Sequence, residues 1–193
     1  AEGLNEAAIA AFKYNYSVLV SGKSTLMPES AIGSVATLPD LESLSVDPDS
    51  KLLKSTVVLK LNGGLGTGMG LDKAKSLLPV TGGFTFLDLI AKQVGSMREE
   101  FKTDLAFMLM NSFSTSADTL AFLGKYGDLA SKDLGLEFVQ NKAPKVTESD
   151  FTPADWPADK SHEWCPPGHG DLYPAMLGSG TLDKLLAKGF KYM

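Results

Sequence analysis

The sequence is poor in the features that mark secreted, membrane-bound and nucleic-acid-binding proteins. Cys165 is the only cysteine, so the chain can form no intrachain disulfide. No apolar run approaches the roughly 18 residues that a membrane-spanning helix needs, and the first residues lack the basic segment and apolar core of a signal peptide. The formal net charge of −5 argues against a general nucleic-acid-binding protein. We therefore expect a cytoplasmic protein without nucleic-acid or membrane partners.

The composition is that of an ordinary globular protein, since 44% of the residues are apolar and 21% are charged. The length of 193 residues is enough for one domain or for a domain with a small appendage. In the first 54 residues, apolar positions at helical spacing predict helices at 5–20 and 28–35. Asn5 can cap the first of them. A connector rich in proline and aspartate is expected at 39–54. We expect residues 1–54 to form a helical region that packs on the rest of the chain.

Strands and helices alternate from residue 55 to residue 193. This order predicts an α/β layer with a largely parallel sheet. The segment 143–167 holds five prolines and few apolar residues, so we expect a long ordered loop or a lid there. The expected strands are 56–61, 105–110, 134–139 and 190–193, and the expected helices are 84–101, 114–124 and 172–188.

The most informative stretch follows the first strand. Five glycines fall within residues 63–70, and Lys73 and Lys75 come soon after them. Glycine lets the backbone turn through positive φ and approach a ligand closely, and successive N–H groups in such a turn bind anions. A strand, a glycine loop and then a lysine is the order expected for a phosphate site at the carboxyl end of a strand.

Two common glycine motifs do not fit this loop. Gly63 and Gly68 have the spacing of a Walker A motif, but Met69 stands where the lysine is required. Met69 also occupies the third glycine position of a G-x-G-x-x-G pattern that starts at Gly64. The broken pattern argues against an NAD-dependent Rossmann oxidoreductase. So does the end of the next strand, where Asn111 follows instead of an acidic residue.

The same stretch resembles the signature of the eukaryotic-type UTP–glucose-1-phosphate uridylyltransferases, also called UDP-glucose pyrophosphorylases. Their pattern is close to K-L-N-G-G-L-G-T-x-M-G, followed by a lysine before a short apolar run, and residues 60–70 and 75–78 match it. The details at 68–75 are most similar to the protozoan-type enzymes. The resemblance implies a Rossmann-like, glycosyltransferase-A-like domain that forms UDP-glucose and pyrophosphate from UTP and glucose 1-phosphate.

Two further segments support the resemblance. Residues 138–145 are similar to the family's F/M-x-Q-N-x-x-P-K segment, in which Gln140 would read the uracil, because a primary amide offers a donor and an acceptor side by side. Residues 166–171 are similar to its P-P-G-H-G-D segment. There Gly168 would let the backbone approach the nucleoside, and His169 would donate to a phosphate. Asp171 precedes a helix, and we expect it to cap that helix.

The resemblance also assigns the remaining candidate residues. Lys75 aligns with the family's catalytic lysine, and Lys73 is a second candidate. Met110 resembles a position beside the base. In-line attack on the α-phosphorus of UTP requires positioning and charge neutralisation more than covalent catalysis. The uridine would be held by the backbone of Leu61, Asn62, Gly63 and Gly64.

The sequence shows no cluster of carboxylates at metal-ligand spacing. Mg²⁺ would still bridge the phosphates of UTP, and the resemblance places its protein ligand beyond Met193. Because the last expected strand is cut short at Met193, we interpret the chain as the N-terminal portion of a longer enzyme. The rest of the catalytic domain and a C-terminal β-helix would be absent, so this portion alone is expected to be inactive.

Two alternatives remain open, and a third family is disfavoured. A broad-specificity UDP-sugar pyrophosphorylase would share these motifs, since the sugar-selecting residues mostly fall outside the chain. A non-catalytic uridine-nucleotide-binding paralogue or fragment would share them too. The UDP-N-acetylhexosamine pyrophosphorylases usually carry an arginine in the glycine loop, and the loop at 67–70 departs from that pattern. The sequence indicates no oligomeric state.

Overall fold

The sheet is parallel and its carboxyl ends meet at one edge. A computed structural model describes residues 3–45, 49–66, 69–71, 73–127, 129–131 and 133–193. Its three-stranded sheet has the order β1 (Val57–Asn62), β2 (Ala106–Asn111), β3 (Glu137–Val139). Asn62 lies opposite Asn111, and Asn111 lies opposite Val139, so all three strands finish side by side. The predicted α/β class with a parallel sheet is confirmed.

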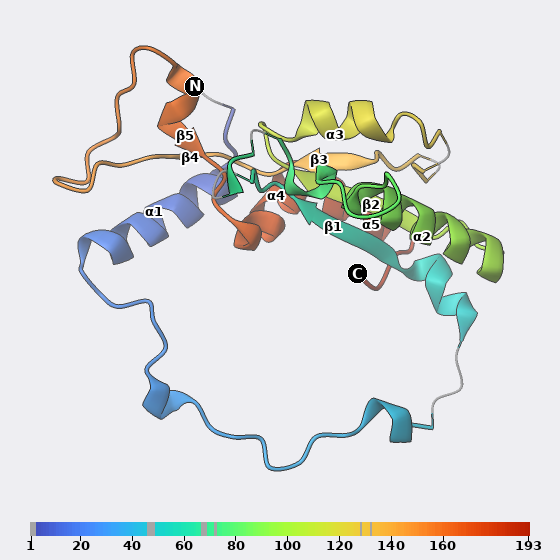
Figure 1. Ribbon diagram of the computed structural model, residues 1–193. Helices are drawn as coiled ribbons and strands as arrows, with labels where there is room; N and C mark the ends of the chain where they lie inside the picture. Colours follow the sequence, from blue (N-terminus) through green and yellow to red (C-terminus); the bar gives the residue numbers. More distant parts are fainter. Residues whose placement is uncertain (1–2, 46–48, 67–68, 72, 128, 132) are drawn as a thin grey trace.

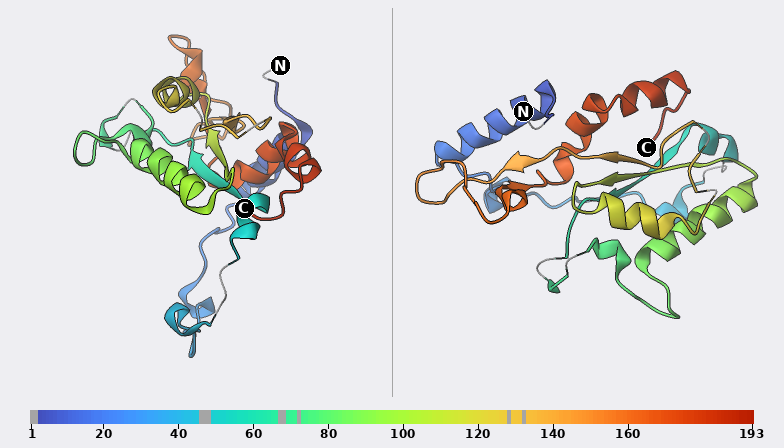
Figure 2. Two further views of the ribbon diagram at one scale, coloured as in Figure 1. Left: turned by 90° about the vertical axis from the view of Figure 1, so that its right-hand side faces the viewer. Right: turned by 90° about the horizontal axis from the view of Figure 1, so that it is seen from above.

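Helices cover both faces of the sheet (Figures 1 and 2). On one face, α2 (Phe86–Phe101) and α3 (Ser116–Leu123) pack against alternate side chains of the strands. On the other face, α4 (Leu172–Gly178) and α5 (Thr181–Ala187) enclose a second apolar cluster. Every residue of β2 is buried, as expected for the central strand of a sheet that is covered on both sides.

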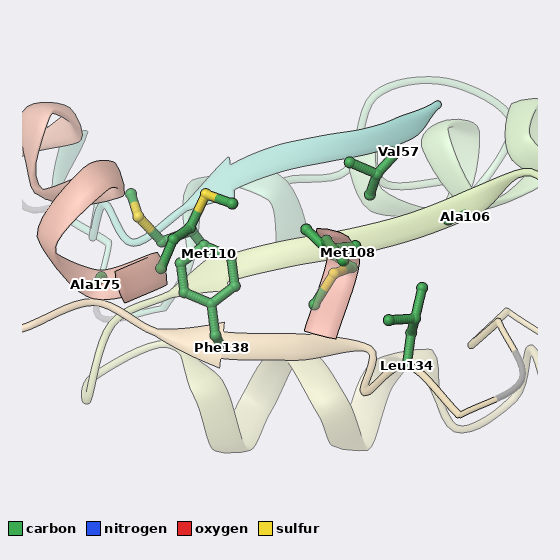
Figure 3. Close-up of a cluster of buried hydrophobic side chains, with 9 residues drawn as sticks. Val57, Ala106, Met108, Met110, Leu134, Phe138 and Ala175 are labelled. Atoms are coloured by element: carbon green, nitrogen blue, oxygen red, sulfur yellow. The ribbon is translucent and has the colours of Figure 1, made fainter. Parts of the chain in front are cut away.

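Figure 3 shows the cluster on the α4 side of the sheet. Met108 and Met110 of β2 point into it with Phe138 of β3, and Ala175 of α4 closes it. Met110 has no exposed surface, so its side chain is part of the core. This packing holds α4, and the turn before it, against the carboxyl half of the sheet.

A buried carboxylate fixes the start of α2. Thr85 and Asp88 form a capping box, in which the Thr85 N–H and hydroxyl donate to Asp88 at 2.8 and 2.9 Å. Asp88 also accepts from the Tyr126 hydroxyl at 2.6 Å and pairs with Lys125 at 2.6 Å. Burial raises the pKa of Asp88, but the hydrogen bonds from Lys125, Thr85 and Tyr126 outweigh it and hold the pKa well below 3.8. The same contact raises the pKa of Tyr126 to about 12.

Several predicted elements are shorter than expected. β3 begins at Glu137 and not at residue 134, and the predicted strand 190–193 makes only an isolated parallel bridge between Tyr192 and Thr56. The predicted helix 172–188 is interrupted at Gly180, whose φ of 69° is left-handed and therefore ends one helix before the next begins. The predicted loop 143–167 contains a two-stranded antiparallel sheet of β4 (Ala143–Pro144) and β5 (Trp164–Cys165).

The N-terminal region has two parts. Helix α1 (Glu6–Val20) begins at the predicted cap Asn5 and packs against α4, but Ile9 and Leu19 of its expected apolar stripe are largely exposed. Residues 23–45, which we call the strap, then bow away from the sheet (Figure 1). The predicted helix 28–35 is wrong, since only the 3₁₀ turn Glu29–Ala31 forms there. None of the described helices has the length and apolarity to span a bilayer.

Candidate nucleotide site

A cavity of about 750 Å³ opens at the carboxyl edge of the sheet. Open parallel sheets bind ligands at this edge. Five of the predicted site residues border the cavity, and they come from three stretches that lie far apart in the sequence. These residues are Gly63, Gly64, Gln140, Gly168 and His169.

Gln140 is the buried polar residue among those that line the cavity. It follows β3, where its N–H donates to the Asn111 carbonyl at 2.8 Å. Only 5% of the residue is exposed, and its Oε1 has no hydrogen-bond partner among the described residues. A Cβ placed on Gly63 would lie 2.0 Å from the Gln140 Nε2. Glycine at position 63 therefore makes room for the amide, whose Oε1 is a buried acceptor without a partner in the described part of the chain.

The glycine loop folds back on itself after β1. Leu65 bridges Ala74 in antiparallel fashion, and the Lys75 N–H donates to the Gly64 carbonyl at 3.4 Å. Residues 67, 68 and 72, which include one of the five glycines, lie outside the described residues. This pairing brings the backbone of Lys75 beside Gly64. The Lys75 and Lys73 side chains are exposed, and neither borders the cavity.

Asn62 joins the elements beneath the glycine loop. Its Nδ2 donates to Asn111 at 2.7 Å and to Thr119 at 2.9 Å, and its Oδ1 accepts from Ser76 at 2.5 Å. Its carbonyl accepts from the Thr115 hydroxyl at 2.9 Å. The side chain of Asn62 therefore ties together β1, β2, α3 and the segment after the loop. Its predicted contact with uridine would have to come from the backbone.

Leu61 and Met110 lie on the apolar side of the strands, away from the cavity lining. Leu61 packs against the cluster that contains Met110. The Leu61 carbonyl accepts from Lys60 Nζ at 2.6 Å, and burial lowers the pKa of Lys60 below its usual value. The structure thus brings five of the ten candidates to the cavity, whereas five others do not border it: Leu61, Asn62, Met110, Lys73 and Lys75.

The turn at Gly168 forms another wall of the cavity. Gly168 has a φ of 109°, a conformation that a residue with a Cβ rarely adopts. Its carbonyl accepts from the Asp171 N–H at 3.1 Å. Asp171 precedes α4, but its side chain makes no capping hydrogen bond, so the expected cap is wrong. Instead its carboxylate accepts from the N–H of Asn141 at 2.6 Å.

Sequence reasoning missed the outer wall of the cavity. Lys145, His162 and Trp164 border it, because the pairing of β4 with β5 brings both ends of the segment 143–167 together beside the cavity. His162 lies 3.9 Å from Asp159 and edge-on to Trp156. Of the lysines and arginines whose positions are described, Lys145 is the one that borders the cavity. The proline content of this segment indicated an ordered loop but not which residues it presents.

No metal centre can be assigned within the described ranges. They hold no group of three or more His, Cys, Asp or Glu residues placed to bind an ion. The arrangement offers instead a buried amide, a glycine-rich backbone and an exposed histidine around one cavity. These groups suit recognition of a nucleobase, with phosphates nearby.

Comparison with known proteins decides the family. A model described as UTP–glucose-1-phosphate uridylyltransferase matches residues 10–193. The chain belongs to this family. A curated potato member is 45% identical over 157 residues, and a probable member from Schizosaccharomyces pombe is 40% identical over 158. They cover 79% and 81% of this chain, which spans only 32% and 30% of them, about a third of their length.

Comparison with solved structures agrees. A mutant of UDP-glucose pyrophosphorylase from Leishmania major, solved in complex with UDP-glucose, matches 97% of this chain at 46% identity and a TM-score of 0.89, over 39% of its own length. A Trypanosoma brucei structure matches 98% of this chain at 44% identity and a TM-score of 0.90, over 41% of its own length. The resemblance inferred from the motifs is confirmed. The potato and Leishmania identities are so similar that they do not single out the protozoan type.

Proposed function

We propose that this protein supplies the uridine-binding part of a UTP–glucose-1-phosphate uridylyltransferase. The complete reaction would form UDP-glucose and pyrophosphate by attack of glucose 1-phosphate on the α-phosphorus of UTP. In this proposal residues 1–54 are an N-terminal region and connector, and residues 55–193 begin the catalytic domain. Family membership supports the reaction, and the cavity at the sheet edge supports the uridine site.

The observation that carries the proposal is the buried amide of Gln140. Its Oε1 lacks a partner among the described residues, although it lies beside a cavity large enough for a nucleoside. The N3–H of uracil would satisfy this acceptor, and the Gln140 Nε2 would donate to the uracil O4. Cytosine has no N3–H and carries an amine in place of O4, so it would meet the same amide with mismatched groups.

The phosphates are proposed to lie along the glycine loop. Backbone N–H groups of Gly63 and Gly64 would approach the nucleotide, with Leu61, Asn62 and the buried Met110 packed behind the lining. Lys75 would neutralise the charge that develops on leaving pyrophosphate, and Lys73 would assist it. His169, which borders the cavity, would donate to the sugar-linked phosphate, while Gly168 lets the chain approach the nucleoside.

Mg²⁺ is proposed to accompany UTP. It would screen the phosphate charges and favour departure of pyrophosphate. Because the described residues provide no metal cluster, we assign it no ligand in this chain. The substrates and products are proposed as the small-molecule partners, and the cytoplasm as the location.

A second candidate function is uridine-nucleotide binding without catalysis. The chain spans about a third of its curated relatives, and all the groups proposed to read uridine lie within it. A broad UDP-sugar pyrophosphorylase differs from the main proposal only in sugar choice.

Calorimetric titration with UTP and CTP, each with Mg²⁺, tests the uridine site. We expect the chain to prefer UTP and Gln140→Ala to lower that preference by about tenfold, the effect of one well-formed hydrogen bond. Gln93→Ala is the matched control, since Gln93 is exposed on α2. Equal affinity of the unmodified chain for UTP and CTP would contradict the proposal.

A further inference from the structure

We propose that Asp171 is a positioning residue that fixes the uracil-reading side chain Gln140 against the Gly168–His169 turn. It would act through Asn141 and contact no substrate itself. This inference rests on the proposed function, because it concerns how selectively the same cavity binds uridine. If the inference is correct, a change that places a donor against a donor in the Asp171–Asn141 contact lowers the preference of the cavity for UTP over CTP.

The contact is short, polar and partly buried. Asp171 Oδ2 accepts from the Asn141 N–H at 2.6 Å, and the Asn141 Nδ2 donates to both carboxylate oxygens at 3.0 and 3.2 Å. Asp171 is 7% exposed. A carboxylate that accepts several hydrogen bonds in a buried site is strongly held in place, because each bond to a charged acceptor is stronger than a neutral one.

This contact completes the anchoring of Gln140 on the strand. The Gln140 N–H is held by the Asn111 carbonyl at 2.8 Å, and the next N–H, that of Asn141, is held by Asp171. The peptide groups on both sides of the Gln140 Cα therefore have fixed partners. β3 ends at Val139, so the second peptide group lies beyond the strand. Its N–H is held by Asp171 and not by a neighbouring strand. The direction of the Gln140 side chain depends on both.

Asp171 also holds the Gly168–His169 turn, which lines the same cavity. Its own N–H donates to the Gly168 carbonyl at 3.1 Å and so closes the turn that carries His169. Asp171 thus contacts Asn141 through its carboxylate and Gly168 through its backbone N–H. The two segments that line the cavity are tied together by a single residue, Asp171, which does not itself border the cavity.

A capping role does not account for this carboxylate. Asp171 stands at the N-terminus of α4, yet its side chain makes no capping hydrogen bond. The hydrogen bonds that its carboxylate accepts come from Asn141, which is 30 residues away in the sequence. Asn141 in turn accepts from the Asn5 side chain at 3.1 Å through its Oδ1. The amide of Asn141 therefore has a defined orientation, with its Nδ2 toward Asp171 and its Oδ1 toward Asn5.

This orientation makes Asp171→Asn an informative change. The variant keeps the size and shape of the side chain but replaces one oxygen by an NH₂ group. Asn141 presents donors to both carboxylate oxygens. One donor would then face another donor, and the segment after Gln140 would have to shift.

The exchanged pair Asn141→Asp with Asp171→Asn restores the match. The N–H of residue 141 would donate to the amide oxygen introduced at position 171, and the amide nitrogen introduced there would donate to the new carboxylate at position 141. That carboxylate would still accept from Asn5. Total charge is unchanged from the unmodified chain. Recovery in the double variant therefore reports the hydrogen-bond pattern and not the loss of an acidic residue.

The experiment is calorimetric titration with UTP and with CTP. Five proteins are compared: the unmodified chain, Asp171→Asn, the exchanged pair, Gln140→Ala, and Gln140→Ala combined with Asp171→Asn. We expect Asp171→Asn to lower the UTP-to-CTP affinity ratio by about fivefold to tenfold, through misplacement of one hydrogen-bonding group. The exchanged pair should recover most of the ratio. Asp171→Asn should change the ratio no further when Gln140→Ala is already present. Asp183→Asn, an exposed acid on α5, is the matched control.

The thermal unfolding midpoint of each variant separates positioning from stability. A lower midpoint with an unchanged affinity ratio in Asp171→Asn overturns the inference and leaves Asp171 a structural residue. Failure of the exchanged pair to recover the ratio, in a variant that unfolds at the midpoint of the unmodified chain, also overturns it. An unmodified chain that prefers neither nucleotide overturns the proposed uridine site together with this inference.

Discussion

The strap and the sheet use apolar residues in opposite ways. Leu105, just before β2, and Leu109, within it, have no exposed surface. Leu38 and Leu41 in the strap are 73% and 80% exposed. Both regions contain leucine and valine residues. In Figure 1 the strap runs outside the layers formed by the sheet and its helices. Hydrophobic side chains therefore do not by themselves place a segment in the core.

The difference follows from how each region satisfies its backbone. Residues 105–110 enter a sheet in which strands on both sides pair with their N–H and C=O groups. The strap contains only the short 3₁₀ turns Glu29–Ala31 and Leu41–Ser43, and Pro28 and Pro39 interrupt any longer helix. The strap therefore forms no regular element with an apolar face of its own, and its large apolar side chains are exposed. We expect stability to depend on the body of the sheet and hardly at all on the strap.

Leu109→Ala should give the largest effect. Leu109 lies at the centre of the cluster between β2 and α2 and is fully buried. Its truncation should lower the free energy of unfolding by about 3–4 kcal/mol, since it loses buried methyl groups and leaves a cavity. Urea denaturation measures the change. Leu186→Ala, at a leucine that is 60% exposed, is the control and should change the free energy by less than about 0.5 kcal/mol.

The sequence predicted the body of the fold better than its interruptions. Apolar runs located β1 and β2, and a regular apolar stripe located α2, because burial on one or both faces leaves a periodic signal. The break at Gly180 was missed, since a glycine near the middle of a helical pattern does not reveal whether it adopts positive φ. The extent of the strap's exposure was missed as well, because exposure depends on the neighbours that a segment finds in space.

The candidate site divides in a similar way. Gly63, Gln140 and His169 were found through motifs, and all three border the cavity. His162 and Trp164 border it too, but they reach it only through the pairing of β4 with β5, a contact between residues some 20 positions apart. The Asp171–Asn141 contact was likewise invisible, because a short-range helix cap was the simpler interpretation of an acid before a helix. Long-range contacts of polar residues leave no periodic trace in a sequence.

Asp88→Asn should have an intermediate effect and a distinct pH dependence. The change removes the charge that pairs with Lys125 and weakens the capping box with Thr85, so we expect a loss of about 2 kcal/mol at pH 7. The pKa of Asp88 is lowered from 3.8 in the folded state. The stabilisation is therefore complete above the unfolded-state pKa and is lost as the pH falls through the folded-state pKa.

Urea denaturation of both proteins at several pH values between 7 and about 2.5 tests this sign, because the window spans the ordinary aspartate pKa. The difference in unfolding free energy between the unmodified chain and Asp88→Asn should be constant above pH 5, which is about one unit above that pKa, and should shrink toward the acid end. Asp183→Asn, at an exposed acid, should show no comparable difference. A difference that stays constant down to pH 2.5 would mean that Asp88 does not titrate differently in the folded protein.

Leu41→Ser in the strap should give the smallest effect and is the sharpest test of the contrast. Leu41 is 80% exposed, so its replacement should change the unfolding free energy by less than about 0.5 kcal/mol, with an unchanged denaturant slope. A loss above about 1 kcal/mol would show that the strap buries apolar surface in solution. Denaturation at several protein concentrations would then locate the partner. A midpoint that rises with concentration would indicate contact with a second copy of the chain, and a constant midpoint would indicate contact with the chain's own sheet.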